Sequence, residues 1–334
     1  MIILLKRFKK KTLITLIIIL TLSLTVPVTV NASLVGDEEI SSKSAIVIDS
    51  DSGLVIYELN ADAQRVPASM TKLIAAYVVF DAIRDGYASF ETMVYINEEK
   101  SLFSYNREFS NVPMPAGSYY SIGELLDVVL VRSACAATVA MVEAVYGSEQ
   151  VAVDKMNEKM ASLGIEAMFY DSWGRSPNNR ISARGMAMAA RAVLQDHPEI
   201  LEITSKSSVM FDDISYSSTN FLFGTYEGID GLKTGFTNPA GWCFTATALQ
   251  NGRRIISVTM GSEMGLRFAD TRVLLDYGFT NVNTVIADHI RGVVFTSDLD
   301  KALESPLVPI IAYDVEDAGY YTLRFLALIL NEPW

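Results

Sequence analysis

The hydrophobic periodicity changes twice along this chain of 334 residues, and this change constrains the fold more than any other feature. Apolar runs at 45–49 and 54–58 flank the turn sequence Ser50-Asp51-Ser52-Gly53, which predicts a β-hairpin. From about residue 69 to 194, apolar residues recur at spacings of three and four, which predicts a block of helices. Three runs joined by tight turns then predict a β-meander. These runs are 229–236, 241–249 and 254–260.

A last helix is predicted for residues 269–277, ended by Gly278. The simplest packing places the first hairpin and the late strands in one antiparallel sheet with flanking helices. The helical block then forms a second, mostly helical lobe, with a cleft between the two. The sequence therefore predicts an α+β fold.

The first 32 residues have the three parts of a secretory signal peptide. Residues 1–11 carry five basic side chains and no acidic one, and an apolar run at 13–26 follows. Val30-Asn31-Ala32 then presents small or apolar residues at the positions that a signal peptidase reads, so we expect cleavage after Ala32. The alternative is an uncleaved anchor, but the run is shorter than the ~20 residues that span a bilayer.

The composition excludes several classes of protein. A net charge of −12 offers little to neutralise phosphates, so no nucleic-acid partner is predicted. Two Cys and two His residues are too few for a disulfide scaffold or a metal centre, so no metal and no cofactor are predicted.

The first of three short motifs is Ser69-Met70-Thr71-Lys72, at the predicted start of a helix. Residues i and i+3 lie on one helix face, so the Lys72 amine can reach the Ser69 hydroxyl. A neutral lysine can take the proton of that hydroxyl, and burial or a nearby positive charge favours the neutral form. Taken alone, the motif also fits a capped helix with a solvated lysine.

Two further motifs complete the set. Ser133-Ala134-Cys135 lies between two predicted helices, where a serine could relay protons. Lys233-Thr234-Gly235 lies in a predicted strand. There the lysine supplies positive potential, the threonine can bind a carboxylate, and the glycine leaves space for a ligand. Taken alone, this motif also fits an edge-strand lysine that discourages aggregation.

In this order and spacing, the three motifs resemble those of the penicillin-recognising serine enzymes. Within that group the chain is similar to the low-molecular-mass D-alanyl-D-alanine carboxypeptidases, which trim peptidoglycan stem peptides. The resemblance implies a β-lactamase/transpeptidase-like fold with the active site in the cleft between the lobes. It identifies residues 33–282 as a serine D,D-peptidase catalytic domain and 283–334 as a short C-terminal appendage. Supporting segments are 65–72, 228–237, 240–242 and 274–279.

The resemblance also implies a role for each matching residue. Ser69 would be the acylated nucleophile, Lys72 its base, and Ser133 a proton relay towards the leaving group. Lys233 would tune the electrostatic field, and Thr234 would hold the terminal carboxylate of the substrate.

Four more residues are implied in substrate binding. The N–H of Phe236, with that of Ser69, would form the oxyanion hole. Gly235 would admit the ligand beside the strand, and Arg267 falls where the family places an arginine near the carboxylate. Cys135 stands where the family usually has Asn and would face the same space as Ser69.

The implied activity is hydrolysis of the terminal D-Ala–D-Ala peptide bond of stem peptides through an acyl-enzyme on Ser69. The implied partners are those stem peptides, with β-lactams as covalent inhibitors. The signal peptide indicates export to the extracellular face of the cell envelope. Because the tail carries no basic amphipathic face, membrane attachment is not expected.

Two alternatives remain at this point. One is a β-lactamase or transpeptidase on the same fold, for which Glu166 could activate the deacylating water. The other is a non-catalytic or weakly active penicillin-binding wall protein. Cys135 favours it, and so does Gly185, which replaces an acid usual in the family.

Overall fold

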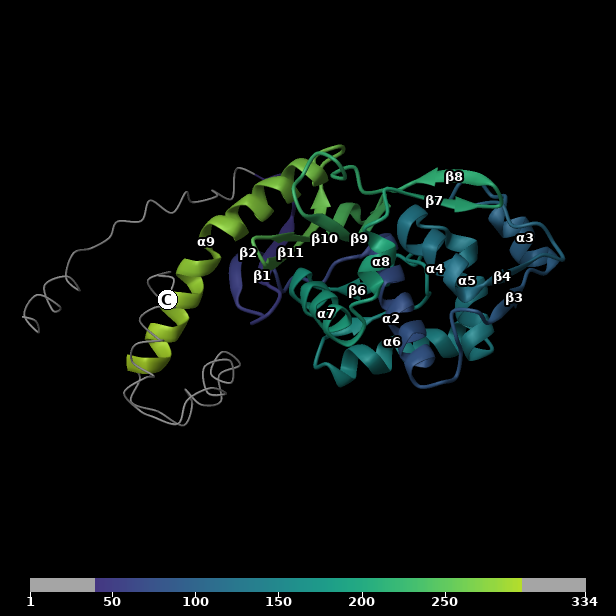
Figure 1. Ribbon diagram of the computed structural model, residues 1–334, viewed down its shortest axis with the longest axis horizontal. Helices are drawn as coiled ribbons and strands as arrows, with labels where there is room; N and C mark the ends of the chain where they lie inside the picture. Colours follow the sequence, from purple (N-terminus) through teal and green to yellow (C-terminus); the bar gives the residue numbers. More distant parts are fainter. Residues whose placement is uncertain (1–39, 296–334) are drawn as a thin grey trace, which may run out of the picture. The chain divides into compact units, whose positions relative to one another are not determined.

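The computed structural model describes residues 40–295, and its centre is one five-stranded antiparallel sheet (Figure 1). The strand order is β2-β1-β11-β10-β9, so the N-terminal hairpin pairs with the last strand of the meander. Beside this pairing, the hydroxyls of Ser42 and Ser262, 220 residues apart in sequence, lie 2.7 Å apart. The predicted single sheet and the α+β class are confirmed. The strands are β1 (Ser44–Asp49), β2 (Val55–Leu59), β9 (Ile229–Thr237), β10 (Gly241–Gln250) and β11 (Arg253–Ser262).

Both faces of the sheet are buried. Successive side chains of a strand point to opposite sides, so each strand contributes residues to two separate cores. Ile46 and Ile48 of β1 belong to the core that they share with the helical lobe. Ala45 and Val47, on the other face, pack in a second core. Two helices cover these faces: α7 (Ala183–Asp196) packs in the first core and α9 (Arg267–Phe295) in the second.

The helical lobe is built around α2 (Thr71–Arg84), which is buried along its first ten residues. It packs against α5, α6 and α7 and also reaches the sheet at β9. This central helix therefore joins the lobe to the sheet. The other helices are α3 (Glu98–Ser104), α4 (Ile122–Asp127), the π-helical turn η3 (Val128–Arg132), α5 (Cys135–Tyr146), α6 (Glu149–Ser162) and α8 (Ile200–Thr204).

A capping box opens α4. The Ser121 hydroxyl accepts from the Glu124 N–H at 3.2 Å, and the Glu124 carboxylate accepts from the Ser121 N–H at 2.8 Å. Such a cap satisfies N–H groups that a helix start otherwise leaves without partners.

Three small two-stranded antiparallel sheets interrupt the helical lobe and were not predicted. Their strands have two to four residues, too few for a period of two to stand out in the sequence. They are β3 (Met93–Tyr95) with β4 (Tyr119–Ser121), β5 (Ala167–Met168) with β6 (Arg180–Ile181), and β7 (Ser208–Phe211) with β8 (Ile214–Ser217).

The last helix differs from its prediction. It runs from Arg267 to Phe295 and passes through Gly278, which was interpreted as its end. A Cβ on Gly278 would lie 2.8 Å from Ile255 Cγ2 and 2.9 Å from Val47 Cγ1. The glycine therefore allows α9 to approach the sheet closely and does not terminate it.

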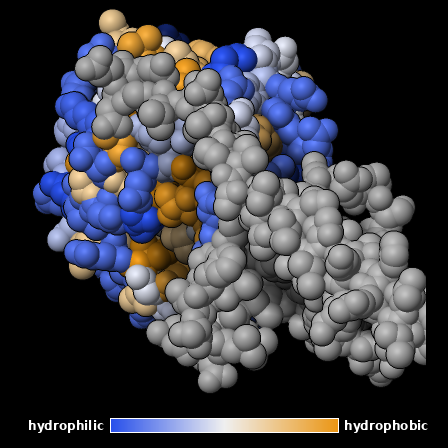
Figure 2. All heavy atoms as spheres, turned by 90° about the vertical axis from the view of Figure 1, so that its left-hand side faces the viewer, coloured by the Kyte–Doolittle hydropathy of each residue, from blue (hydrophilic) through white to orange (hydrophobic). Residues whose placement is uncertain are grey.

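Parts of the predicted organisation lie outside the described residues. These are the signal peptide, 1–32, and the appendage from residue 296 onward. The predicted limit of the catalytic domain, residue 282, lies within α9. Among residues 40–295, no helix combines the length and the apolarity needed to cross a bilayer. On the α9 side, hydrophilic side chains cover most of the visible described surface, and apolar ones gather in several groups (Figure 2).

Candidate active site

Ser69 lies in a tight turn immediately before the central helix. The turn is the 3₁₀ segment η2 (Ala68–Met70), and α2 follows at Thr71. Ala68 has a φ of +50°, which is uncommon for a residue other than glycine. The helix start was predicted at about Ser69, so the structure places the serine on the turn that leads into the helix.

Lys72 is fully buried, one turn after Ser69. As the i, i+3 spacing predicts, its Nζ lies 2.9 Å from Ser69 Oγ. The same Nζ donates to the main-chain oxygen of Trp173 at 2.6 Å. The alternative of a solvated lysine is therefore wrong. A buried amine held against a serine hydroxyl is an arrangement that can activate a nucleophile.

Ser133 reaches the cleft through an unusual backbone. The π-helical turn η3 ends in Ser133, whose φ of 69° and ψ of 33° are left-handed, and α5 begins two residues later. Local π-helical turns are frequent at functional sites. The sequence motif located this serine, but nothing in the motif indicated the left-handed conformation.

Lys233 and Thr234 occupy the middle of β9. Lys233 is buried, and its Nζ donates to the Thr234 carbonyl at 3.1 Å. Burial, and then the positive charges of Lys72 and Arg267, hold the pKa of Lys233 well below its ordinary value. Thr234 Oγ1 donates to Thr219 Oγ1 at 2.7 Å, which orients the hydroxyl.

Gly235 has a role that the sequence did not indicate. A Cβ there would lie 2.8 Å from the Pro67 carbonyl oxygen and 3.2 Å from the Met70 nitrogen. The missing side chain therefore lets the Ser69 turn pack directly against β9, in addition to leaving the strand open to the cleft. This contact fixes the distance between the predicted nucleophile and the predicted carboxylate-binding strand.

Arg267 is the first residue of α9 and is buried. It donates to the Gly235 carbonyl at 3.1 Å and stacks over the Trp242 ring at 4.7 Å. Its Nε is buried with no hydrogen-bond partner among the described residues, and burial lowers its pKa to about 10. This guanidinium retains donor capacity for an anion in the cleft.

Both cysteines are free thiols. Cys135 is nearly buried, with Sγ 3.7 Å from the Ser133 carbonyl oxygen, and it lines the same cleft as Ser69. Cys243 lies on β10, and burial raises the pKa of its thiol to about 11.

These residues surround one cleft of about 630 Å³. Every predicted site residue lines it except Lys72 and Lys233, which are buried behind its wall. Among the lining residues that were not singled out from the sequence are Thr219 and the aromatic pair Phe109 and Trp173, whose ring centroids lie 5.1 Å apart. No motif marks them, because they come from loops that only the fold brings to the cleft.

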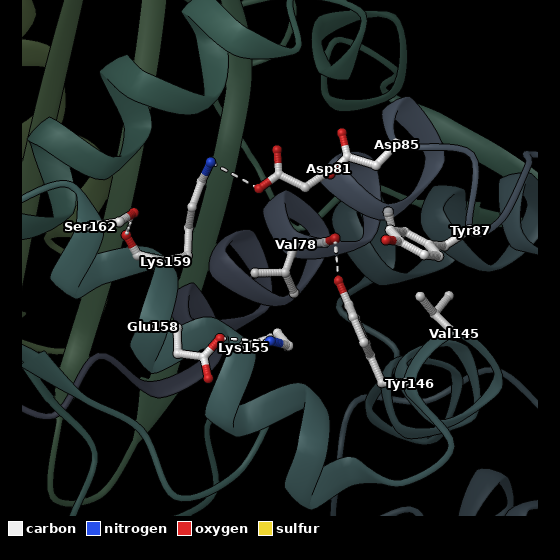
Figure 3. A pocket seen from close by; sticks show the side chains of 11 residues that line it. Val78, Asp81, Asp85, Tyr87, Val145, Tyr146, Lys155, Glu158, Lys159 and Ser162 are labelled. Atoms are coloured by element: carbon white, nitrogen blue, oxygen red, sulfur yellow. Dashed lines mark hydrogen bonds and ion pairs between the residues drawn. The ribbon is translucent and has the colours of Figure 1, made fainter.

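A second cavity, of about 590 Å³, lies in the helical lobe between α2, α5 and α6 (Figure 3). Two ion pairs lie there: Lys159 with Asp81 at 2.8 Å, and Lys155 with Glu158 at 2.7 Å. None of the predicted site residues lines it. Among residues 40–295, no group of three or more His, Cys, Asp or Glu side chains is placed to hold a metal ion.

Comparison with known proteins gives a consistent result. The sequence model of a family described as D-alanyl-D-alanine carboxypeptidase matches residues 29–264. The D-alanyl-D-alanine carboxypeptidase DacA of Haemophilus influenzae is 32% identical over 255 residues, which are 74% of this chain and 64% of that protein. The chain thus spans less than two thirds of the length of this curated relative.

Solved structures match the same part of the chain. A peptidoglycan synthesis regulatory factor, PBP3, of Streptococcus pneumoniae is 33% identical, with a TM-score of 0.69 and 72% of each chain covered. Penicillin-binding protein D2 of Listeria monocytogenes, in an ampicillin-bound form, is 28% identical, with a TM-score of 0.63 and coverage of 72% of this chain and 98% of that one. The predicted β-lactamase/transpeptidase-like fold is confirmed.

Proposed function

The chain belongs to the D-alanyl-D-alanine carboxypeptidase family of serine peptidases, and from this premise we propose that it removes the terminal D-alanine from peptidoglycan stem peptides. The observation that carries the proposal is the Ser69–Lys72 pair, 2.9 Å apart, at the wall of a cleft that Thr234 and Arg267 also line. A nucleophile with its base lies in the same space as groups suited to an anion.

The reaction is acyl transfer in two steps. Ser69 Oγ attacks the carbonyl carbon of the penultimate D-alanine while neutral Lys72 takes the hydroxyl proton. The C–N bond then breaks, the leaving amine receives a proton through Ser133, and the last D-alanine departs. Water hydrolyses the ester on Ser69 and frees the shortened peptide.

The terminal carboxylate of the substrate binds between β9 and the start of α9. The Thr234 hydroxyl and the Arg267 guanidinium donate to it. Its negative charge also pairs with the positive charge of the buried Arg267 guanidinium, which favours occupation of the cleft by a carboxylate.

The structure bears on both alternatives. Glu166, which a β-lactamase mechanism would need near Ser69, is exposed and does not line the cleft. Gly185 is the third residue of α7, where its N–H donates to the helix-capping Ser182 hydroxyl at 3.0 Å. An acid at this position could supply the second half of a capping box, so its replacement leaves the Ser182 cap in place and removes no group of the cleft.

The test is release of D-alanine from a synthetic stem peptide ending in D-Ala-D-Ala, with Ser69→Ala as the matched variant. We expect release by the wild-type protein and none by Ser69→Ala. A fluorescent penicillin should label the wild type covalently and should not label Ser69→Ala or Lys72→Ala. Labelling without release would instead support a non-catalytic penicillin-binding protein, and labelling of Ser69→Ala would refute the mechanism.

We further propose that the mature chain begins at Ser33 and acts at the extracellular face of the cell envelope. The support is the basic start, the apolar run and the Val30-Asn31-Ala32 site. N-terminal sequencing of the protein from cells tests this, and a chain that still begins at Met1 would contradict it.

A further inference from the structure

The loop at 170–179 holds the base of the proposed reaction, although no sequence motif marked it for this role. A neutral lysine amine has two hydrogens and one lone pair. To accept the Ser69 proton, the lone pair must point at Oγ. Donation of one N–H to the Trp173 carbonyl, at 2.6 Å, fixes the rotation of the amine, so that one of the two remaining positions on Nζ faces Ser69 and can hold the lone pair.

The orientation of that carbonyl depends on the other end of the same peptide group. The peptide unit between Trp173 and Gly174 is planar, with its C=O and N–H pointing in opposite directions. Its oxygen accepts from Lys72, and its N–H donates to Asp171 Oδ1 at 2.6 Å. A carboxylate acceptor makes this a strong, charge-assisted hydrogen bond.

The Asp171 carboxylate also accepts hydrogen bonds from other residues of the loop. They come from the Arg175 N–H and from Asn179 Nδ2, each at 3.2 Å, and from the Ser176 N–H. The loop therefore wraps around one carboxylate, and one of that carboxylate's hydrogen bonds goes to the peptide that faces Lys72.

Packing leaves this peptide little freedom. Gly174 has a φ of +89°, and a Cβ there would lie 2.0 Å from the Ala68 carbonyl oxygen. The peptide is thus pressed against the turn that carries Ser69. A small rotation of the plane would move the oxygen away from Lys72, and misplacement by about 1 Å in an active site can lower a rate ~100-fold.

A second acidic residue anchors the same loop without contacting this peptide. Glu149 Oε1 accepts from the Ser172 N–H at 2.9 Å and from the Ser172 hydroxyl at 2.7 Å. Loss of Glu149 therefore loosens the loop, whereas loss of Asp171 also frees the group that orients Lys72. The two side chains form a matched pair for an experiment.

We propose that Asp171 is a positioning residue for Lys72, acting through the Trp173–Gly174 peptide. This inference rests on the proposed function. It assigns Asp171 to the acylation step and not to substrate binding, because its carboxylate does not line the cleft.

The experiment measures acylation by a fluorescent penicillin and separates the binding constant from the first-order acylation rate. Asp171→Ala should lower the acylation rate about tenfold or more with an unchanged binding constant. Asp171→Asn keeps an acceptor for the Gly174 N–H and should recover to within about threefold of wild type. Glu149→Gln should acylate within about twofold of wild type. Asp171→Ser, a milder change to the turn, should lose about fivefold or more with a native melting temperature.

Three outcomes would overturn the inference while leaving the proposed function intact. They are an Asp171→Ala or Asp171→Ser protein that acylates like Glu149→Gln, a loss confined to the binding constant, and an Asp171→Asn protein as slow as Asp171→Ala. If the wild-type protein takes up no penicillin and releases no D-alanine, the proposed function fails and this inference fails with it.

Discussion

Lys233 is buried, and Lys72 and Arg267 lie nearby, so its protonated form is disfavoured in the folded state, first by burial. In the unfolded chain it keeps its proton up to the ordinary pKa of 10.5. Between the lowered pKa and 10.5 the unfolded state therefore binds more protons, and stability rises with pH. The free energy of unfolding of wild type minus that of Lys233→Met should rise by up to about 1.4 kcal/mol per pH unit in this window.

Urea unfolding at about pH 8.5 and 10 measures this difference. Lys43→Met, at an exposed lysine, is the control and should show no such rise. A difference for Lys233→Met that is flat or falls with pH would show that Lys233 is not disfavoured as a cation in the folded protein.

Cys135 offers the cleft a weak hydrogen-bonding group where an amide would offer a donor and an acceptor. Cys135→Asn should therefore acylate faster, by roughly 5- to 150-fold if the new bond forms in the transition state. Cys135→Ala should stay within about twofold of wild type. Rates of labelling with a fluorescent penicillin test both, and a well-folded Asn variant that is no faster than wild type would refute the prediction.

At the scale of the elements, the turn that carries Ser69 packs directly against β9. This contact depends on Gly235 lacking a side chain. Gly235→Ala must separate them or distort the turn, because Pro67 O would be 2.8 Å from the new Cβ. We expect at least a tenfold slower acylation by penicillin. Gly123→Ala, where the nearest atom would lie at 3.4 Å, is the matched control and should acylate normally. Equal rates for the two variants would rule out this account of Gly235.

The long helices and strands could be predicted from the sequence, whereas the strands of two to four residues could not. Apolar residues at spacings of three and four from about residue 69 located α2. Three long apolar runs joined by tight turns located β9 to β11. Gly278 was misread because a glycine that stops a helix and one that admits a close neighbour look alike in sequence.

Some residues of the candidate site could likewise be predicted from the sequence, and others could not. Ser69, Lys72 and Ser133 could be found because their chemistry depends on side-chain type and spacing. The part played by Trp173 could not, since its main-chain oxygen contacts Lys72 and any residue has such an oxygen. What positions that oxygen is the hydrogen bonding of the loop, which becomes visible only in three dimensions.

At the scale of the whole molecule, the two lobes share one core. Ile46 and Ile256 of the sheet belong to the same buried cluster as Leu73 and Met141 of the helices. We therefore expect the sheet and the helical lobe to unfold together. Tryptophan fluorescence, which reports on Trp173 and Trp242 at the cleft, and far-ultraviolet circular dichroism should give coincident urea transitions. Two separated transitions would contradict a shared core.

The pairing of β1 with β11 also sets the order of events when the chain first folds. The hairpin formed by β1 and β2 has no partner strand until the chain has been made as far as residue 262. Contacts between such distant segments close slowly, because a long loop must lose its freedom before any contact forms. A newly made chain therefore stays incompletely folded during most of its synthesis, which is the condition that the export proposed above would need.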